Sequence, residues 1–315
     1  MLPLAALFYC LSAIRRWAYR SGILPVVQLP LPVVVVGNIS VGGVGKTPLV
    51  IYLVQQLRAR GHSPGVVSRG YGGDGKPALV GAAADPARVG DEPVLIQRRC
   101  GCPVVVGRDR IAAARTLLAA WPDTTVIISD DGLQHYRLSR QVELAVVDQR
   151  GMMNGWLLPA GPLRETPSRL TKVDAVVGNG TTSAPLQDLA VPFFCMQPRP
   201  GEFYALGEPT RRPASADFQG QRVHAVAGIG SPQRFFDQLA AMGISAQAHA
   251  FPDHHAYVAD ELSFDGTCIL TTEKDAVKLL HLNLPLPVWV LPIDVEIAPD
   301  LAEFVVEKLH GFPPA

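Results

Sequence analysis

The sequence predicts an α/β protein with a mostly parallel sheet of the P-loop NTPase type and a second, smaller α/β domain. An apolar run at 33–36 leads into a glycine-rich turn and a Lys-Thr pair. Apolar stretches of strand length then alternate with helical patterns as far as about residue 190, which is typical of strands buried on both faces of a parallel sheet. A second alternation begins at Val223, after a proline-rich stretch.

The stretch from residue 33 to residue 48 has the layout of a P-loop. Glycines allow successive backbone N–H groups to point inward around phosphate oxygens. Lys46 adds a positive charge for the terminal phosphates, and the Thr47 hydroxyl is suited to Mg²⁺. The residues expected to bind the nucleotide are Ser40, Val41, Gly42, Gly43, Val44, Gly45, Lys46 and Thr47. The usual G-x-x-x-x-G-K-[ST] pattern is incomplete, because Ser40 takes the place of its first glycine.

The expected helix after this loop shows an amphipathic stripe, and Gly61 is placed to end it. Its apolar positions are Leu49, Val50, Leu53, Val54 and Leu57. The positive end of the helix would therefore face the bound anion.

A second chemical signal is an apolar strand that ends in two carboxylates, Asp130 and Asp131. P-loop enzymes hold Mg²⁺ with such an aspartate, here opposite Thr47. Gln134 and His135 follow and are candidates for positioning a group near the metal, although a capped or exposed histidine is the plainer interpretation of His135.

Several arginines follow strands at the edge where open α/β sheets bind ligands. Arg69 follows a strand at 65–68 in a glycine-rich loop, which either contacts substrate or phosphate or is simply a flexible turn. Arg108 and Arg110 follow a strand at 104–106. Arg164 lies in a proline- and glycine-rich loop, and a rigid arginine suits phosphate.

Two acidic residues, Asp91 and Glu92, precede Pro93 at the start of an expected helix. On the residues alone, the simpler interpretation is that they cap this helix.

The second domain offers weaker signals. Gly228-Ile229-Gly230 lacks a third glycine at the needed spacing, so we interpret it as a strand-to-helix turn. His254 beside Asp253 has the composition of an oriented base. Thr272 is expected to cap a helix, with Asp275 three residues on, or else to contact the nucleotide.

Composition limits the possible classes of protein. The 315 residues are 48% hydrophobic, enough for a large core in two domains or one large domain. The net charge is zero, which argues against nucleic acid as a partner. The five cysteines show neither a zinc spacing nor a disulfide framework, so a reducing compartment is expected.

The chain is expected to divide into four parts. Residues 1–24 carry apolar side chains at helical spacing, followed by Arg15, Arg16 and Arg20. This run is too short to span a bilayer, and its charges follow the apolar part, unlike those of a signal peptide. It is either an amphipathic helix in the membrane interface or a first helix packed on the protein. The other expected parts are a P-loop kinase domain at 25–191, a linker at 192–215 and the smaller domain at 216–315.

Taken together, the motifs resemble those of the tetraacyldisaccharide 4'-kinase family, the lipid A 4'-kinases of Gram-negative bacteria. The resemblance runs in order from about residue 33 to residue 278, and it includes an incomplete P-loop. It rests on Gly37-Asn38, Ser40 to Pro48, Ser68-Arg69-Gly70-Tyr71, Gly90-Asp91-Glu92-Pro93, Asp130-Asp131-Gly132-Leu133-Gln134-His135, Leu158-Pro159-Ala160-Gly161-Pro162-Leu163-Arg164-Glu165, Phe251-Pro252-Asp253-His254 and Thr272-Glu273-Lys274-Asp275.

The resemblance implies ATP- and Mg²⁺-dependent phosphorylation of the 4'-hydroxyl of a lipid A disaccharide 1-phosphate, which forms lipid IVA. It places the enzyme at the cytoplasmic face of the inner membrane, with the lipid substrate and the membrane surface as partners and no protein partner. Membrane contact of the first helix then becomes the favoured interpretation.

By similarity, Asp91 and His254 would pair as the catalytic base. Asp131 would hold Mg²⁺ with Thr47, and Asp130 and Glu92 are further candidate ligands. Arg110 and Arg164 would meet phosphates, with Arg108 as the alternative to Arg110. Arg69 and Gln134 are the other residues expected to contact the substrate or its phosphates. Because Asp91 and His254 fall in different expected domains, we expect the domains to close over the substrate.

Two other functions compete with this one. A nucleotide switch or metallochaperone GTPase would need N-K-x-D to recognise guanine, and in Thr272-Glu273-Lys274-Asp275 the lysine comes one position too late. A soluble small-molecule kinase would not need the apolar face from Leu4 to Ile14.

Overall fold

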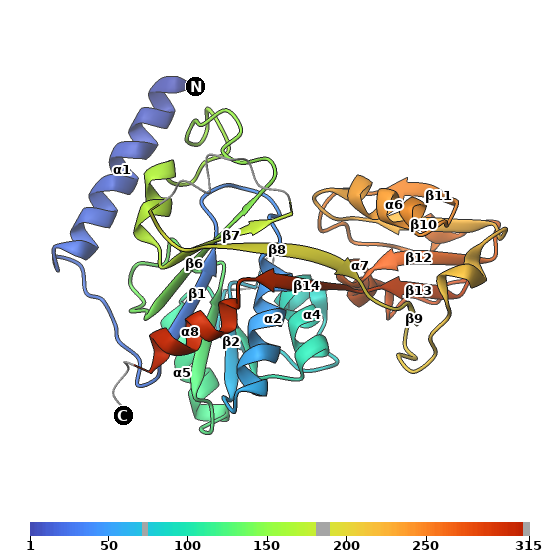
Figure 1. The fold of residues 1–315 in the computed structure, drawn as a ribbon, viewed down its shortest axis with the longest axis horizontal. Helices are drawn as coiled ribbons and strands as arrows, with labels where there is room; N and C mark the ends of the chain where they lie inside the picture. The colour runs from blue at the N-terminus through green and yellow to red at the C-terminus, as the bar shows by residue number, and fades with distance from the viewer. Residues whose placement is uncertain (71–74, 181–189, 311–315) are drawn as a thin grey trace.

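The computed structural model describes residues 1–70, 75–180 and 190–310. Within these residues the strands form two sheets, which belong to two units lying side by side (Figure 1). The larger sheet has nine strands, in the spatial order β14 (Ile293–Ala298), β8 (Phe193–Pro200), β7 (Ala175–Asn179), β6 (Val142–Asp148), β1 (Val33–Gly37), β5 (Val126–Asp130), β2 (Pro64–Ser68), β4 (Val104–Val106) and β3 (Ala78–Leu79). Its strands run parallel except for the two at its edges, β14 and β3.

The smaller sheet has five strands, and only β9 at its edge runs antiparallel to its neighbour. In spatial order these strands are β11 (Ala246–Ala250), β10 (Val223–Ala227), β12 (Cys268–Thr272), β13 (Val288–Leu291) and β9 (Tyr204–Ala205). The predicted mostly parallel α/β fold with a smaller second α/β unit is thus confirmed.

The α-helices are α1 (Leu2–Arg20), α2 (Lys46–Ala59), α3 (Pro86–Val89), α4 (Asp91–Cys100), α5 (Arg110–Ala120), α6 (Pro232–Ala241), α7 (Glu273–Leu279) and α8 (Leu301–Leu309). Short 3-10 turns lie at Pro167–Lys172, Ser215–Phe218 and Ala259–Leu262. Helix α1 lies along the outside of the larger unit (Figure 1).

Strand β1 is buried on both faces, which explains its unbroken apolar sequence. Val34 and Val36 pack in one core cluster with side chains of α2 and α4, whereas Val33 and Val35 pack in a second cluster with side chains of α5. Burying a side chain of this size contributes roughly 1.5–3 kcal/mol. The centre of the sheet is therefore a firm support for the loop that follows β1.

The expected linker at 192–215 differs from what the structure shows. Most of its first half is β8, a strand of the larger sheet, and the prolines that suggested a linker are tolerated for a local reason. Within the described residues β7 pairs with β8 only as far as Met196, whereas β14 pairs with β8 from Cys195 to Pro200. Pro198 and Pro200 therefore lie where one edge of β8 has no strand beside it, so a missing N–H costs little.

The end of the chain also returns to the larger unit. Strand β14 pairs with β8, and α8 contributes Leu301, Val305 and Leu309 to the core cluster that contains Val34. Residues 293–309, expected in the smaller domain, thus belong to the larger one. The long β8–β14 ribbon connects the two units (Figure 1).

Candidate active site

The P-loop follows the carboxyl end of β1, as predicted, and α2 begins at Lys46. Gly45 precedes it with φ of 93°, a conformation that side chains rarely adopt. A Cβ atom at Gly45 would also overlap the side chain of Asn179. Asn179 in turn donates a hydrogen bond of 2.9 Å to the carbonyl of Val44. The loop is thus held from β7, and the amino end of the 14-residue helix α2 is presented to an anion.

Three of the predicted charged residues meet at this edge of the sheet. The ammonium of Lys46 lies 3.2 Å from Asp131 Oδ1, and Arg164 Nη1 lies 3.3 Å from Asp131 Oδ2. Burial of Asp131 favours its neutral form, but the charges of Lys46 and Arg164 outweigh burial and lower its pKa. Asp131 is therefore ionised and pairs with two positively charged side chains beside the P-loop.

Asp130 has the environment of a cation ligand. It is 1% exposed, and its Oδ2 accepts a 2.9 Å hydrogen bond from the Ser68 hydroxyl. Its Oδ1 has no hydrogen-bond partner among the described residues. Burial, together with the charges of Glu92 and Asp131, raises the pKa of Asp130 to about 6. A buried carboxylate with an unpaired oxygen fits a divalent cation.

The described residues contain no group of three or more His, Cys, Asp or Glu side chains arranged around one metal position. Mg²⁺ usually takes only one or two protein carboxylates and completes its shell with water and substrate phosphates. The donor set predicted for it, Thr47, Asp131, Asp130 and Glu92, therefore stays a prediction.

Asp91 and His254 are in contact, although 163 residues separate them. His254 Nδ1 lies 2.9 Å from Asp91 Oδ2 and 3.1 Å from Oδ1. Asp91 is the first residue of α4, after Gly90 at the cap position, and its Oδ1 accepts a 2.9 Å hydrogen bond from the N–H of Glu92. Asp91 thus satisfies a first-turn N–H of α4, as the capping interpretation expects, and it also makes a contact that joins the two units.

This contact shifts the pKa values of both groups. Burial favours neutral Asp91, but the hydrogen bond from His254 and the charge of Lys274 outweigh it, so the pKa of Asp91 is lowered. The same hydrogen bond raises the pKa of His254, against burial and the charge of Lys274. His254 also has a φ of 61°, an uncommon conformation for a residue with a side chain, and such conformations are concentrated at functional sites.

Sequence reasoning assigned no role to Lys274, although the motif that contains it was recognised. Its ammonium lies 3.0 Å from Asp253 Oδ1, 3.3 Å from Glu92 Oε1 and 3.4 Å from His254 Nε2. Thr272 caps helix α7 as predicted, because its hydroxyl accepts a hydrogen bond from the N–H of Asp275. Lys274 therefore reaches the larger unit from the first turn of α7.

The other predicted phosphate ligands have different surroundings. Arg110 is buried and donates to the carbonyls of Gly107 and Asp130, so it supports the end of β5. Gln134 donates to the carbonyl of Asn38 and to Glu165 Oε1. Arg69 is exposed at the end of β2, and residues 71–74 of its glycine-rich loop lie outside the described residues. Phosphate contact by all three stays a prediction.

Arg150 is a residue that sequence reasoning missed. It donates a hydrogen bond of 2.9 Å to the carbonyl of Gly43 in the P-loop and one of 2.8 Å to Asp148 at the end of β6. No motif marked it, because its place beside the loop depends on how β6 lies next to β1.

A pocket of about 470 Å³ lies between the two units and contains the P-loop. Its polar end has Lys46, Thr47, Glu92 and Lys274, and its apolar lining includes Ile51, Leu95, Met196, Ile229, Phe235 and Leu291. This division suits a nucleoside triphosphate, with phosphates at the loop and the base among apolar side chains.

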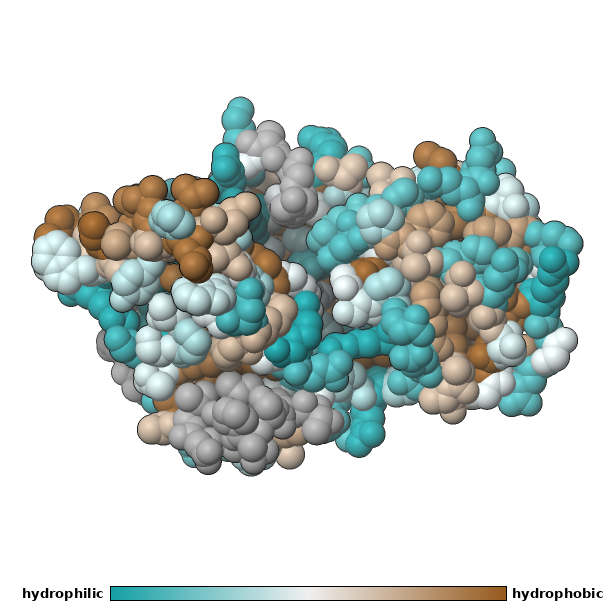
Figure 2. All heavy atoms as spheres, turned by 90° about the horizontal axis from the view of Figure 1, so that it is seen from above, coloured by the Kyte–Doolittle hydropathy of each residue, from teal (hydrophilic) through white to brown (hydrophobic). Residues whose placement is uncertain are grey.

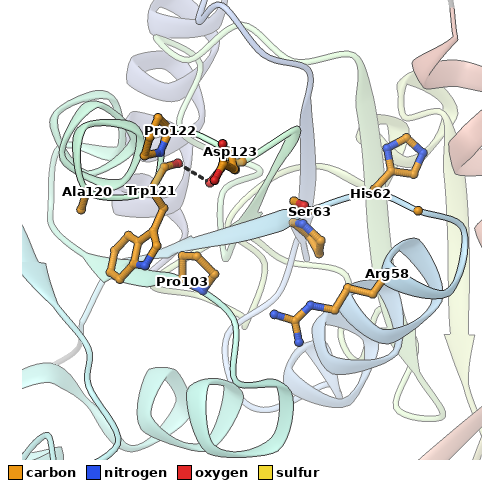
Figure 3. A pocket seen from close by; sticks show the side chains of 11 residues that line it. Arg58, His62, Ser63, Pro103, Ala120, Trp121, Pro122 and Asp123 are labelled. Carbon is orange, nitrogen blue, oxygen red and sulfur yellow. Dashed lines mark hydrogen bonds between the residues drawn. The ribbon is translucent and has the colours of Figure 1, made fainter.

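A larger pocket of about 590 Å³ lies at the opposite edge of the sheet. Figure 3 shows Trp121 and Pro103 on one side of this pocket and Arg58 and His62 on the other. It adjoins the amino ends of β2 and β5, whereas parallel sheets bind ligands at the carboxyl ends of their strands. The cleft with the P-loop is therefore the candidate active site.

A P-loop lies beside paired carboxylates, and the second unit lines the other side of the cleft. This combination defines the class of P-loop phosphotransferases. Comparison with known proteins then gives the family. The family model described as tetraacyldisaccharide-1-P 4'-kinase matches residues 1–310, and the chain belongs to this family.

Its relatives include the tetraacyldisaccharide 4'-kinases of Azoarcus sp. and Chromobacterium violaceum. The first is 52% identical over 318 residues, covering 100% of this chain and 93% of the relative. The second is 51% identical over 322 residues, covering 99% and 94%. A crystal structure of LpxK from Aquifex aeolicus in complex with ATP is 28% identical, with a TM-score of 0.83 and 98% of each chain covered. The predicted kinase is thereby confirmed, and the nucleotide-switch alternative is not favoured.

Proposed function

We propose that this chain transfers the γ-phosphoryl group of ATP to the 4'-hydroxyl of tetraacyldisaccharide 1-phosphate, at the cytoplasmic face of the inner membrane. One observation carries the proposal most directly. The Asp91–His254 pair joins the two units beside the same cleft that the P-loop lines, since Glu92 and Asp253, the neighbours of the pair, both line it. The relatives named above and the ATP complex of the Aquifex protein support the choice of acceptor and donor.

The arrangement fits transfer to an alcohol. The sugar hydroxyl gives its proton to the Asp91–His254 pair while its oxygen forms a bond to the γ-phosphorus, and the bond from that phosphorus to the β-phosphate oxygen breaks. Lys46 and Arg164 neutralise the charge that develops on the phosphates. Asp130 and Asp131 would hold Mg²⁺, which would supply further positive charge to offset the charge of the phosphates.

The experiment that tests this function offers the protein γ-labelled ATP and tetraacyldisaccharide 1-phosphate in mixed detergent micelles. Label is expected on the lipid at the 4' position, and a 4'-deoxy analogue should receive none. Undiminished ATP hydrolysis with no label on the lipid would reject the proposal in favour of a nucleotide switch.

The first helix supports the membrane location. Figure 2 shows apolar side chains gathered at the end of the molecule where α1 lies. Its exposed apolar residues include Leu4, Leu7, Leu11, Ile14 and Trp17. The opposite side of α1 meets the protein, with Ala5 buried and Arg16 paired to Glu165. Within the described residues, no helix has the length and apolar character needed to cross a bilayer.

Substituting Leu7→Asp and Leu11→Asp together is expected to weaken binding to anionic phospholipid vesicles by at least tenfold. The reason is that burying each leucine in the interface contributes roughly 1.5–3 kcal/mol, which the aspartates remove. Vesicle flotation measures this loss. Val258→Asp is a matched control, since Val258 is similarly exposed but lies on the smaller unit. Equal flotation of all three proteins would mean that α1 does not bind the membrane.

A further inference from the structure

The side chain of Asn38 touches the P-loop lysine. Its Oδ1 lies 3.3 Å from the ammonium of Lys46, while its Nδ2 donates a hydrogen bond of 2.8 Å to the carbonyl of Ser40. Asn38 is 0% exposed and follows β1 directly. Because the amide N–H group is committed to Ser40, the amide oxygen has a fixed orientation toward Lys46.

The backbone of Asn38 is fixed as well. Its carbonyl accepts a hydrogen bond of 2.9 Å from Gln134 Nε2, and the same Nε2 donates a hydrogen bond of 2.9 Å to Glu165 Oε1. Glu165 is 2% exposed and is held by the Tyr136 hydroxyl and by Arg16 of α1. A continuous set of partly buried polar contacts therefore runs from α1 to the P-loop lysine.

The position of Lys46 depends on a balance between two acceptors. Asp131 is ionised and attracts the ammonium strongly, at 3.2 Å, while the neutral Asn38 oxygen attracts it from another side at 3.3 Å. Without Asn38 the ammonium would move fully onto Asp131, and it would then have to leave that carboxylate to reach a phosphate.

We propose that Asn38 is a positioning residue that keeps Lys46 free to meet the ATP phosphates. Gln134, which is itself hydrogen-bonded to Glu165, fixes the backbone of Asn38. The inference deepens the proposed function and rests on it. It also gives Gln134 a role different from the direct substrate contact predicted from the sequence.

The test measures binding of a non-hydrolysable ATP analogue by calorimetry to the full chain. Asn38→Ala is expected to weaken binding about tenfold, as loss of a hydrogen bond to a charged group does. In a Lys46→Ala background the same substitution should weaken binding less than twofold, because it acts through Lys46. Asn283→Ala replaces an exposed asparagine that does not line the cleft, and this matched control should bind as the wild type does.

Gln134→Ala provides a second variant if Asn38→Ala fails to fold. It is expected to weaken binding about threefold, again only when Lys46 is present. Equal weakening in both backgrounds, or wild-type binding by both variants, would overturn the inference. If Lys46→Ala itself binds the analogue as tightly as the wild type, the nucleotide site of the proposed function fails instead.

Discussion

Replacing Asp91 with asparagine is expected to slow phosphoryl transfer by about 10²–10⁴-fold, the usual contribution of a general base. The asparagine oxygen still accepts a hydrogen bond from His254, so the contact between the units is retained. What is lost is the negative charge, which stabilises the imidazolium once the proton has moved. The measurement is single-turnover transfer of label to the lipid, with ATP binding measured in parallel and expected to be unchanged.

The chain offers a matched control for this substitution in the neighbouring histidine. His255 Nε2 lies 3.0 Å from Glu261 Oε2, so Glu261→Gln alters a histidine–carboxylate pair of the same kind outside the cleft lining. Its transfer rate should stay within twofold of the wild type. Equal losses in the two variants would show that the effect of Asp91 is not specific to the base.

The pH profile distinguishes a catalytic loss from a structural one. Protonation of His254 removes the acceptor, so activity falls as the pH drops through the pKa of that residue. Its hydrogen bond to Asp91 raises this pKa, so the wild-type enzyme should lose activity at a pH above the ordinary histidine pKa. In Asp91→Asn the raising charge is gone, and the acidic limb of the residual activity should move to lower pH. An unchanged limb would argue against His254 as the titrating group.

The P-loop and its carboxylates could be predicted because their chemistry is local in sequence. The glycine-rich turn must follow a buried strand and begin a helix, and residues 33–59 contain all three in order. Asp131 could be placed beside the P-loop, opposite Thr47, because the carboxyl ends of neighbouring parallel strands meet at one edge, and β1 pairs with β5. In the structure Asp131 lies 3.2 Å from Lys46 of this loop.

Contacts that depend on the path of the folded chain could not be predicted in the same way. Lys274 reaches Glu92 only because the smaller unit lies against α4. Asn38 reaches Lys46 only because the turn between them folds back, an arrangement that no periodicity records. The β8–β14 ribbon could not be predicted because a stretch with several prolines is typical of a linker. The prolines fit a strand only where one edge of β8 is unpaired, and the sequence does not show that edge.

A loss of similar size is expected for Lys46→Ala, on the order of 10³-fold in transfer, because positive charge at the transferring phosphate is the main form of catalysis in this chemistry. Lys46→Arg should not restore the rate. The positions of Asn38 and Asp131, at 3.3 and 3.2 Å, suit one compact ammonium, whereas a guanidinium is planar and larger. The same labelled-lipid assay measures both variants.

Lys308→Ala is the matched control for that series, since Lys308 also pairs with an aspartate, Asp174 at 3.1 Å, but lies on α8 outside the cleft lining. It should transfer phosphate at the wild-type rate. Lys46→Ala leaves Asp131 with Arg164 at 3.3 Å, so this carboxylate keeps a cation and the melting temperature should change little. A rate loss with an unchanged melting temperature therefore assigns Lys46 to the reaction, whereas a fall in both would assign it to the fold.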